Sequence, residues 1–83
     1  MKATREEVYD AIDTERTYQS CVWSGMDEQN SIADYIIYLK RYIREAECIS
    51  DPSTPSNVLN TIRKVAAIAV ACMERHGAPR RVA

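Results

Sequence analysis

Apolar residues recur every three or four positions in three separate stretches of the chain, which is the spacing of one face of an α-helix. The pattern predicts helices over residues about 4–23, 31–49 and 55–76, and no strand. The second stretch is the most regular, and we expect its stripe to face the core. That stripe comprises Ile32, Tyr35, Ile36, Leu39, Tyr42, Ile43, Ala46 and Ile49. The predicted fold is therefore an all-α, three-helix domain spanning residues 1–83.

The predicted helix ends carry recognisable stop and start signals. The first two helices each open on a capping box, in which a hydroxyl residue and an acidic residue three positions later bond each other's backbone N–H groups. The pairs are Thr4 with Glu7 and Ser31 with Asp34. Residues 24–27 and the linker at 50–55 are expected to separate the helices. Gly77 is expected to end the third helix, and Pro79 prevents it from resuming.

The third helix is apolar around its whole circumference. One face carries Val58, Leu59, Ile62, Val65, Ala66, Ala69, Cys72 and Met73. The rest is also apolar, through Ala67, Ile68, Val70 and Ala71. Two partner helices cover only part of such a surface, so we expect a homo-oligomeric helical bundle formed through this helix. The alternative is an alanine-rich helix that packs closely on two partners and leaves small side chains exposed.

Composition indicates a folded protein in a reducing compartment. The chain is 46% hydrophobic and 28% charged, as in globular domains. Its longest apolar run, residues 65–73, is far shorter than the ~20 residues that span a bilayer. The charged beginning of the chain lacks a signal-peptide pattern. The cysteines Cys21, Cys48 and Cys72 form an odd set without metal-ligand spacing. These features predict a cytoplasmic protein. We interpret the three cysteines as small apolar side chains that fill space between helices.

Charge is distributed unevenly along the chain. Residues 1–30 hold three Lys or Arg against seven Asp or Glu, whereas residues 31–83 hold eight against five. The overall net charge of −1 disfavours binding to nucleic acid or membrane surfaces. A local basic site for a small phosphorylated ligand remains compatible with this distribution. Residues 77–83 form a basic C-terminal tail.

Acidic residues of the first helix are the only candidates for a metal site. Glu7, Asp10 and Asp13 are spaced so that they project together and can hold Mg²⁺, but acids at a helix N-terminus are also common without a metal. Glu15 lies on the apolar stripe and requires a partner. We expect a structural ion pair with Arg63 or Lys64, and the alternative is a group that faces a ligand or metal. No metal or cofactor is predicted.

No arrangement typical of covalent catalysis occurs. His76 is the only histidine, and the chain lacks a Walker loop and a G-x-G-x-x-G motif. Arginine and tyrosine together are typical of a pocket that holds phosphate and stacks on a base. The candidate ligand-binding residues are Arg16, Tyr18, Gln19, Trp23, Arg63, Lys64, His76 and Arg80.

Two segments carry a resemblance to known proteins. Residues 15–19 (ERTYQ) with Trp23, and residues 62–80 (IRKVAAIAVACMERHGAPR), resemble small proteins of tailed phages and prophages. These proteins are distantly similar to MazG-like all-α nucleoside triphosphate pyrophosphohydrolases, which hold Mg²⁺ with an E-x-x-E and an E-x-x-D pair. This chain lacks that set, because its only E-x-x-D, from Glu7 to Asp10, stands alone.

The resemblance implies a helical scaffold that binds a nucleotide without hydrolysing it. The leading hypothesis is a non-enzymatic phage accessory protein that sequesters a small nucleotide-type immune signal as counter-defence in the host cytoplasm. In it Arg16, Arg63, Lys64 and Arg80 contact phosphate, and Tyr18 or Trp23 stacks on a base. One alternative is a degenerate MazG-like pyrophosphohydrolase that uses Glu7, Asp10 and Glu15 with Mg²⁺. Another is a protein-interaction module that inhibits a host protein through Ile37 and Tyr38.

Overall fold

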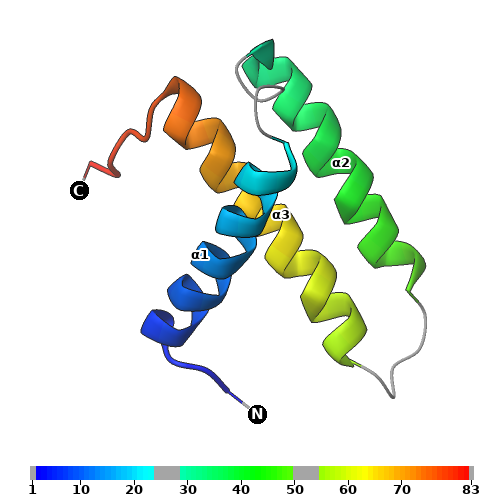
Figure 1. The fold of residues 1–83 in the computed structure, drawn as a ribbon. Helices are drawn as coiled ribbons and strands as arrows, with labels where there is room; N and C mark the ends of the chain where they lie inside the picture. Colours follow the sequence, from blue (N-terminus) through cyan, green and yellow to red (C-terminus); the bar gives the residue numbers. More distant parts are fainter. Residues whose placement is uncertain (1, 24–28, 50–54, 83) are drawn as a thin grey trace.

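Three helices make up the structure, a computed structural model that describes residues 2–23, 29–49 and 55–82. They are α1 (Arg5–Val22), α2 (Ile32–Cys48) and α3 (Pro55–His76) (Figure 1). The predicted all-α fold is confirmed, and the predicted helices agree with the observed ones to within a residue at each end. The predicted breaks at 24–27 and over most of the 50–55 linker lie outside the described residues.

Both predicted capping boxes are present. The Glu7 backbone N–H donates to the Thr4 hydroxyl oxygen at 3.1 Å, and the Thr4 backbone N–H donates to the Glu7 carboxylate at 3.1 Å. Ser31 and Asp34 make the same reciprocal pair at the start of α2, at 2.9 and 3.1 Å. Each box satisfies two backbone donors that the first turn of a helix leaves unpaired, which fixes where the helix begins.

Helix α3 ends at the predicted glycine. The Gly77 N–H donates to the Met73 carbonyl at 2.8 Å, and Gly77 has φ +118°, a conformation that residues with a side chain rarely adopt. The exposed residues that follow, 78–82, form no regular secondary structure. The C-terminal tail therefore leaves the helix at a defined point.

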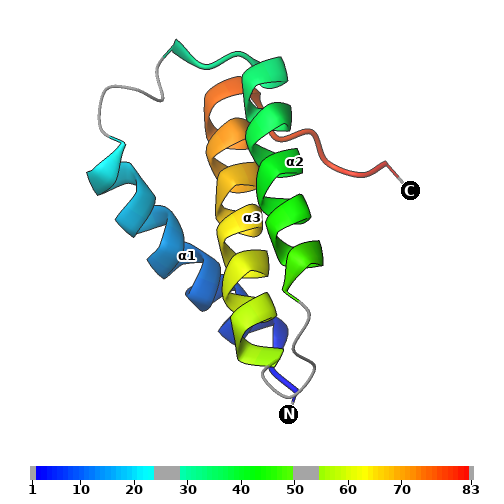
Figure 2. The ribbon, with the colours of Figure 1, turned by 90° about the vertical axis from the view of Figure 1, so that its right-hand side faces the viewer.

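Helix α3 is the central element of the fold. It packs against both α1 and α2, which make few contacts with each other. Helices α2 and α3 run antiparallel side by side, whereas α1 crosses α3 at an angle (Figures 1 and 2). None of the described helices is long and apolar enough to cross a bilayer.

The core lies where α2 meets α3. Tyr35, Ile68 and Ala71 are fully buried there. Partly buried side chains surround them: Trp23, Tyr38, Leu39, Tyr42 and Cys72. Ala67, also fully buried, and Ala71 place only a methyl group between α3 and its neighbours, so the helices can approach closely.

Candidate functional site

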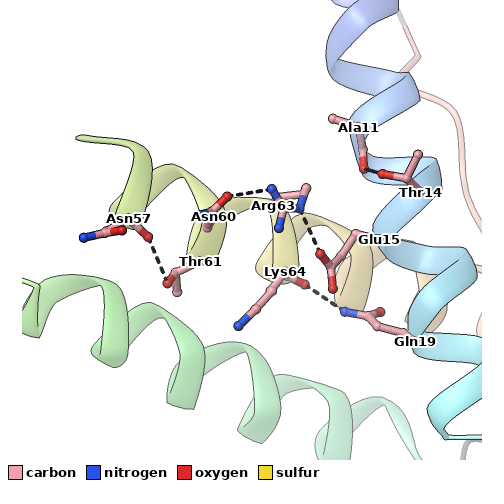
Figure 3. Close-up of polar contacts among 9 residues, drawn as sticks. All are labelled: Ala11, Thr14, Glu15, Gln19, Asn57, Asn60, Thr61, Arg63 and Lys64. Atoms are coloured by element: carbon pink, nitrogen blue, oxygen red, sulfur yellow. Dashed lines mark hydrogen bonds and ion pairs between the residues drawn. The ribbon is translucent and has the colours of Figure 1, made fainter. Parts of the chain in front are cut away.

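A polar cluster joins α1 to α3 (Figure 3). The Arg63 Nε–H donates to a Glu15 carboxylate oxygen at 2.8 Å, and an Arg63 Nη1–H donates to the Asn60 side-chain oxygen at 2.7 Å. The Glu15 side chain is only 10% exposed, against 35% for Arg63. The ion pair expected for Glu15 is therefore confirmed, with Arg63 as the partner.

Gln19 is a buried polar residue whose burial the sequence did not reveal. Its side chain is 4% exposed, and its Nε2–H donates to the Lys64 backbone carbonyl at 3.4 Å. The Lys64 side chain extends away from Gln19 (Figure 3). Gln19 therefore links the two helix backbones, and helical spacing gave no signal of this because the residue is polar.

A second ion pair ties α1 to the far end of α3. The Arg16 Nε–H donates to a Glu74 carboxylate oxygen at 2.6 Å, and the Glu74 side chain is largely exposed. Together with the pair of Glu15 and Arg63, this ion pair fixes adjacent residues of α1 to two separate positions on α3. Two of the predicted phosphate-binding arginines are thus engaged with carboxylates.

The remaining predicted ligand residues lie apart from that cluster. His76 Nε2 lies 2.9 Å from the Asn30 backbone oxygen, and the His76 ring meets the Tyr35 ring edge-to-face at 6.0 Å between centroids. Tyr18 is exposed on α1, and Trp23 packs against the core. Arg80 is exposed in the tail. The structure therefore brings Arg16, Gln19, Arg63 and Lys64 to the α1–α3 contact and does not gather the whole set around one pocket.

The acidic residues of α1 are exposed along its first turns. Within the described ranges, no group of three His, Cys, Asp or Glu residues is close enough to hold a metal ion. Two hydrogen bonds from Thr4, one from its backbone and one from its hydroxyl, hold the pKa of Glu7 below its ordinary value. Glu7 therefore remains ionised as a helix cap.

One side of the α2–α3 pair is uncovered. We call it the open face, and its large side chains are Ile32, Ile36 and Ile43 of α2 with Leu59, Ile62 and Met73 of α3. All six are exposed, Ile36, Ile43, Ile62 and Met73 by 46%, 41%, 42% and 44%. The first half of α1 borders the open face at Leu59 and Ile62, and the rest of the face is left uncovered.

Helical geometry explains why these side chains share one side. Successive residues are rotated by about 100° about the helix axis. In an antiparallel pair, the residue after each interface residue therefore points to the same side of the pair on both helices. Ile36 and Ile43 follow the core tyrosines Tyr35 and Tyr42 on α2, as Ala69 follows Ile68 on α3.

The second half of α1 lies on the other side of α3. Gln19 bonds the carbonyl of Lys64, and Ile62 and Met73 lie about 160–180° around α3 from Lys64. The first half of α1 borders Ile62 without burying it, so both Ile62 and Met73 remain exposed.

Two shallow grooves lie in or beside the open face. One, of about 450 Å³, runs along α2 between Ile36, Leu39 and Ile43, with charged side chains on its rim. The rim residues are Lys40, Arg44 and Glu47. The other, of about 380 Å³, lies between the first halves of α1 and α3 and is lined mostly by apolar atoms. Leu59 and Ile62 line it beside Glu7.

The expectation that the whole α2 stripe faces the core is wrong for three isoleucines. Ile32, Ile36 and Ile43 are exposed, because α3 contacts only the part of the stripe centred on Tyr35 and Tyr42. The available signal was the width of the stripe, since adjacent apolar residues such as Tyr35 and Ile36 cannot both face one partner helix.

The fold defines the class of protein: an all-α domain of three helices. Comparison of the chain with protein families, curated proteins and solved structures gave no match.

Proposed function

We propose that this chain is a protein-interaction module that acts by binding another polypeptide through the open face. The observation that carries the proposal is the pair of apolar stripes, from α2 and α3, left uncovered side by side. Large apolar patches on small domains mark interaction sites, because exposing them to water is unfavourable. The heptad-like spacing of Ile32, Ile36, Leu39 and Ile43 suits a helical partner surface.

Nucleotide sequestration, the leading hypothesis from the sequence, receives less support from the structure. Arg16 and Arg63 each meet a carboxylate, and a phosphate group would have to displace Glu74 or Glu15 from them. The phage accessory role and the relation to MazG-like enzymes remain predictions from the sequence. Isothermal titration with cyclic and linear nucleotides tests the sequestration hypothesis, and heat of binding would favour it over polypeptide binding.

In-cell photocrosslinking tests the proposed function. A photoreactive amino acid placed at Ile36 or Ile43 should yield covalent adducts with polypeptide in the producing cell. The matched control is the same substitution at Tyr9, which is exposed on α1 away from the open face. The mass of each adduct identifies whether the partner is this chain or another. Equal yields at Ile36 and Tyr9, or no polypeptide adduct at Ile36, would refute the proposed function.

A further inference from the structure

We infer that the polypeptide bound to the open face is a second copy of this chain, related by a two-fold axis that sets α3 antiparallel to its counterpart. This inference rests on the proposed function and names its partner. In a two-fold dimer the same patch serves both subunits, so the residues of the patch must complement one another after the rotation. The open face meets that requirement on α2, on α3 and in its charges.

The apolar stripe of α3 on the open face is symmetric about its own centre. Leu59, Ile62, Ala66, Ala69 and Met73 alternate spacings of three and four residues. Ala66 and Ala69 are equidistant from the midpoint between Ala67 and Ile68, and so are Ile62 and Met73. An antiparallel copy therefore sets Ala66 against Ala69, where small side chains allow close approach, and Ile62 against Met73 on either side.

The same two-fold axis also pairs the isoleucines of α2. Ile36 and Ile43 are equidistant from the midpoint between residues 39 and 40. Tyr35 packs with Ile68 and Ala71 and its ring meets that of His76, and α2 runs antiparallel to α3, so residue 39 lies level with the middle of α3, near residue 67. One axis at this level therefore sets Ile36 against Ile43 while it pairs the α3 stripe.

Charge complementarity selects the antiparallel arrangement. Glu7 lies beside Ser56 and Asn60 near the start of α3, next to the exposed Glu6 and Asp10. The opposite end of α3 leads into the basic tail with Arg80 and Arg81. An antiparallel copy brings its basic tail to the acidic start of α1 in both halves of the dimer. A parallel copy would place like charges together.

Opposite charges at Ile62 and Met73 test this arrangement directly. The two side chains are equally exposed and lie too far apart along α3 to contact each other within one chain. Ile62→Glu or Met73→Lys alone should raise the dimer dissociation constant about thirtyfold or more, because each places an unpaired charge in the interface. The measurement is sedimentation equilibrium of the full chain. Ile37→Glu, on an exposed α2 position outside the open face, is the matched control.

The double variant distinguishes the orientations. In the antiparallel dimer the introduced glutamate faces the introduced lysine twice, so Ile62→Glu/Met73→Lys should dimerise within about tenfold of the natural chain. An equimolar mixture of the two single variants should likewise form a mixed dimer. A parallel dimer would set each introduced charge against its own kind, and the double variant would then dissociate further.

The outcomes separate this inference from the proposed function. Circular dichroism of each variant checks that the helices are retained. A chain that stays monomeric up to millimolar concentration, single variants that dimerise normally, or a double variant that stays dissociated overturns the antiparallel dimer. Photocrosslinks from Ile36 to a different protein would then still uphold the proposed function, whereas the absence of any polypeptide adduct would remove both.

Discussion

Glu15 and Arg63 form an ion pair in which only the carboxylate is nearly buried, and this difference determines how much the pair contributes to stability. The carboxylate is nearly buried while the guanidinium reaches water. Removing the guanidinium would leave a buried charge unpaired, whereas removing the carboxylate leaves a cation that water can still solvate. The pair therefore specifies how α1 sits on α3 more than it adds stability.

Truncation of the two interhelical acids should have unequal effects. We expect Glu15→Ala to lower the free energy of unfolding by about 1–3 kcal/mol, because it empties a packed site and removes the partner of Arg63. Glu74→Ala, the matched change at the more exposed carboxylate, should cost less than about 1 kcal/mol. Urea denaturation of both variants measures the difference. Equal losses would mean that burial of Glu15 contributes nothing.

The capping box of α1 should make stability depend on acidity. The pKa of Glu7 is lowered in the folded chain by its hydrogen bonds to Thr4. The stability that Glu7 contributes is therefore complete above the pKa that Glu7 has in the unfolded chain. That contribution is lost as the pH falls through the lower pKa of the folded chain. Glu7→Gln keeps a capping side chain that does not titrate, so its melting temperature should fall less between pH 7 and about pH 3 than that of the natural chain. A parallel fall in both would contradict the assignment.

Gly77 tests the end of α3. Its positive φ strains any residue that carries a side chain, and no atom lies within 4 Å of the position a Cβ would take. Gly77→Ala should therefore cost about 1 kcal/mol through backbone strain alone, without a packing defect. Thermal melting provides the measurement. An unchanged melting temperature would indicate that the last turn of α3 unwinds at little cost.

At the scale of the helices, alanine is what allows α3 to serve as the central element. Ala67 and Ala71 are fully buried where α3 meets its neighbours. Ala71→Leu should destabilise the fold by about 1–3 kcal/mol, because the added carbon atoms must displace the packed Tyr35 and Ile68. Ala33→Leu, on the exposed side of α2, is the control and should change stability by less than about 0.5 kcal/mol. Chemical denaturation of both variants checks the contrast.

The sequence predicted the helices well because their signals are local. Caps such as Thr4 with Glu7, and the terminating Gly77, act within a few residues, so they could be read directly. Glu15 could also be assigned a cationic partner, since a carboxylate on an apolar stripe has few alternatives.

Which apolar residues face which neighbour could not be predicted. Ile36 and Tyr35 are equivalent in the pattern, and only the position of α3 buries one and exposes the other. Burial of Gln19 likewise depends on how closely α1 approaches Lys64. Such outcomes follow from the angle between helices, which local spacing does not determine.

At the scale of the whole molecule, the fold has one covered side and one open side. Helix α1 packs against α3 and is held there by polar contacts, whereas the open face presents isoleucines to water. A domain this small buries a limited core, so covering the open face would add a large part of its stability. Folding and association should therefore be coupled.

That coupling predicts that the melting temperature depends on protein concentration. A species that is favoured by association gains stability as concentration rises, whereas a monomer melts at the same temperature at any dilution. For a dimer of this size, a hundredfold increase in concentration should raise the midpoint by roughly 5–10 °C. Ile62→Glu should remove this dependence while retaining helical circular dichroism, and Ile37→Glu should preserve it. A natural chain whose midpoint stays constant over that range would show that the open face remains in contact with water, so that the three helices must be stable without a second copy.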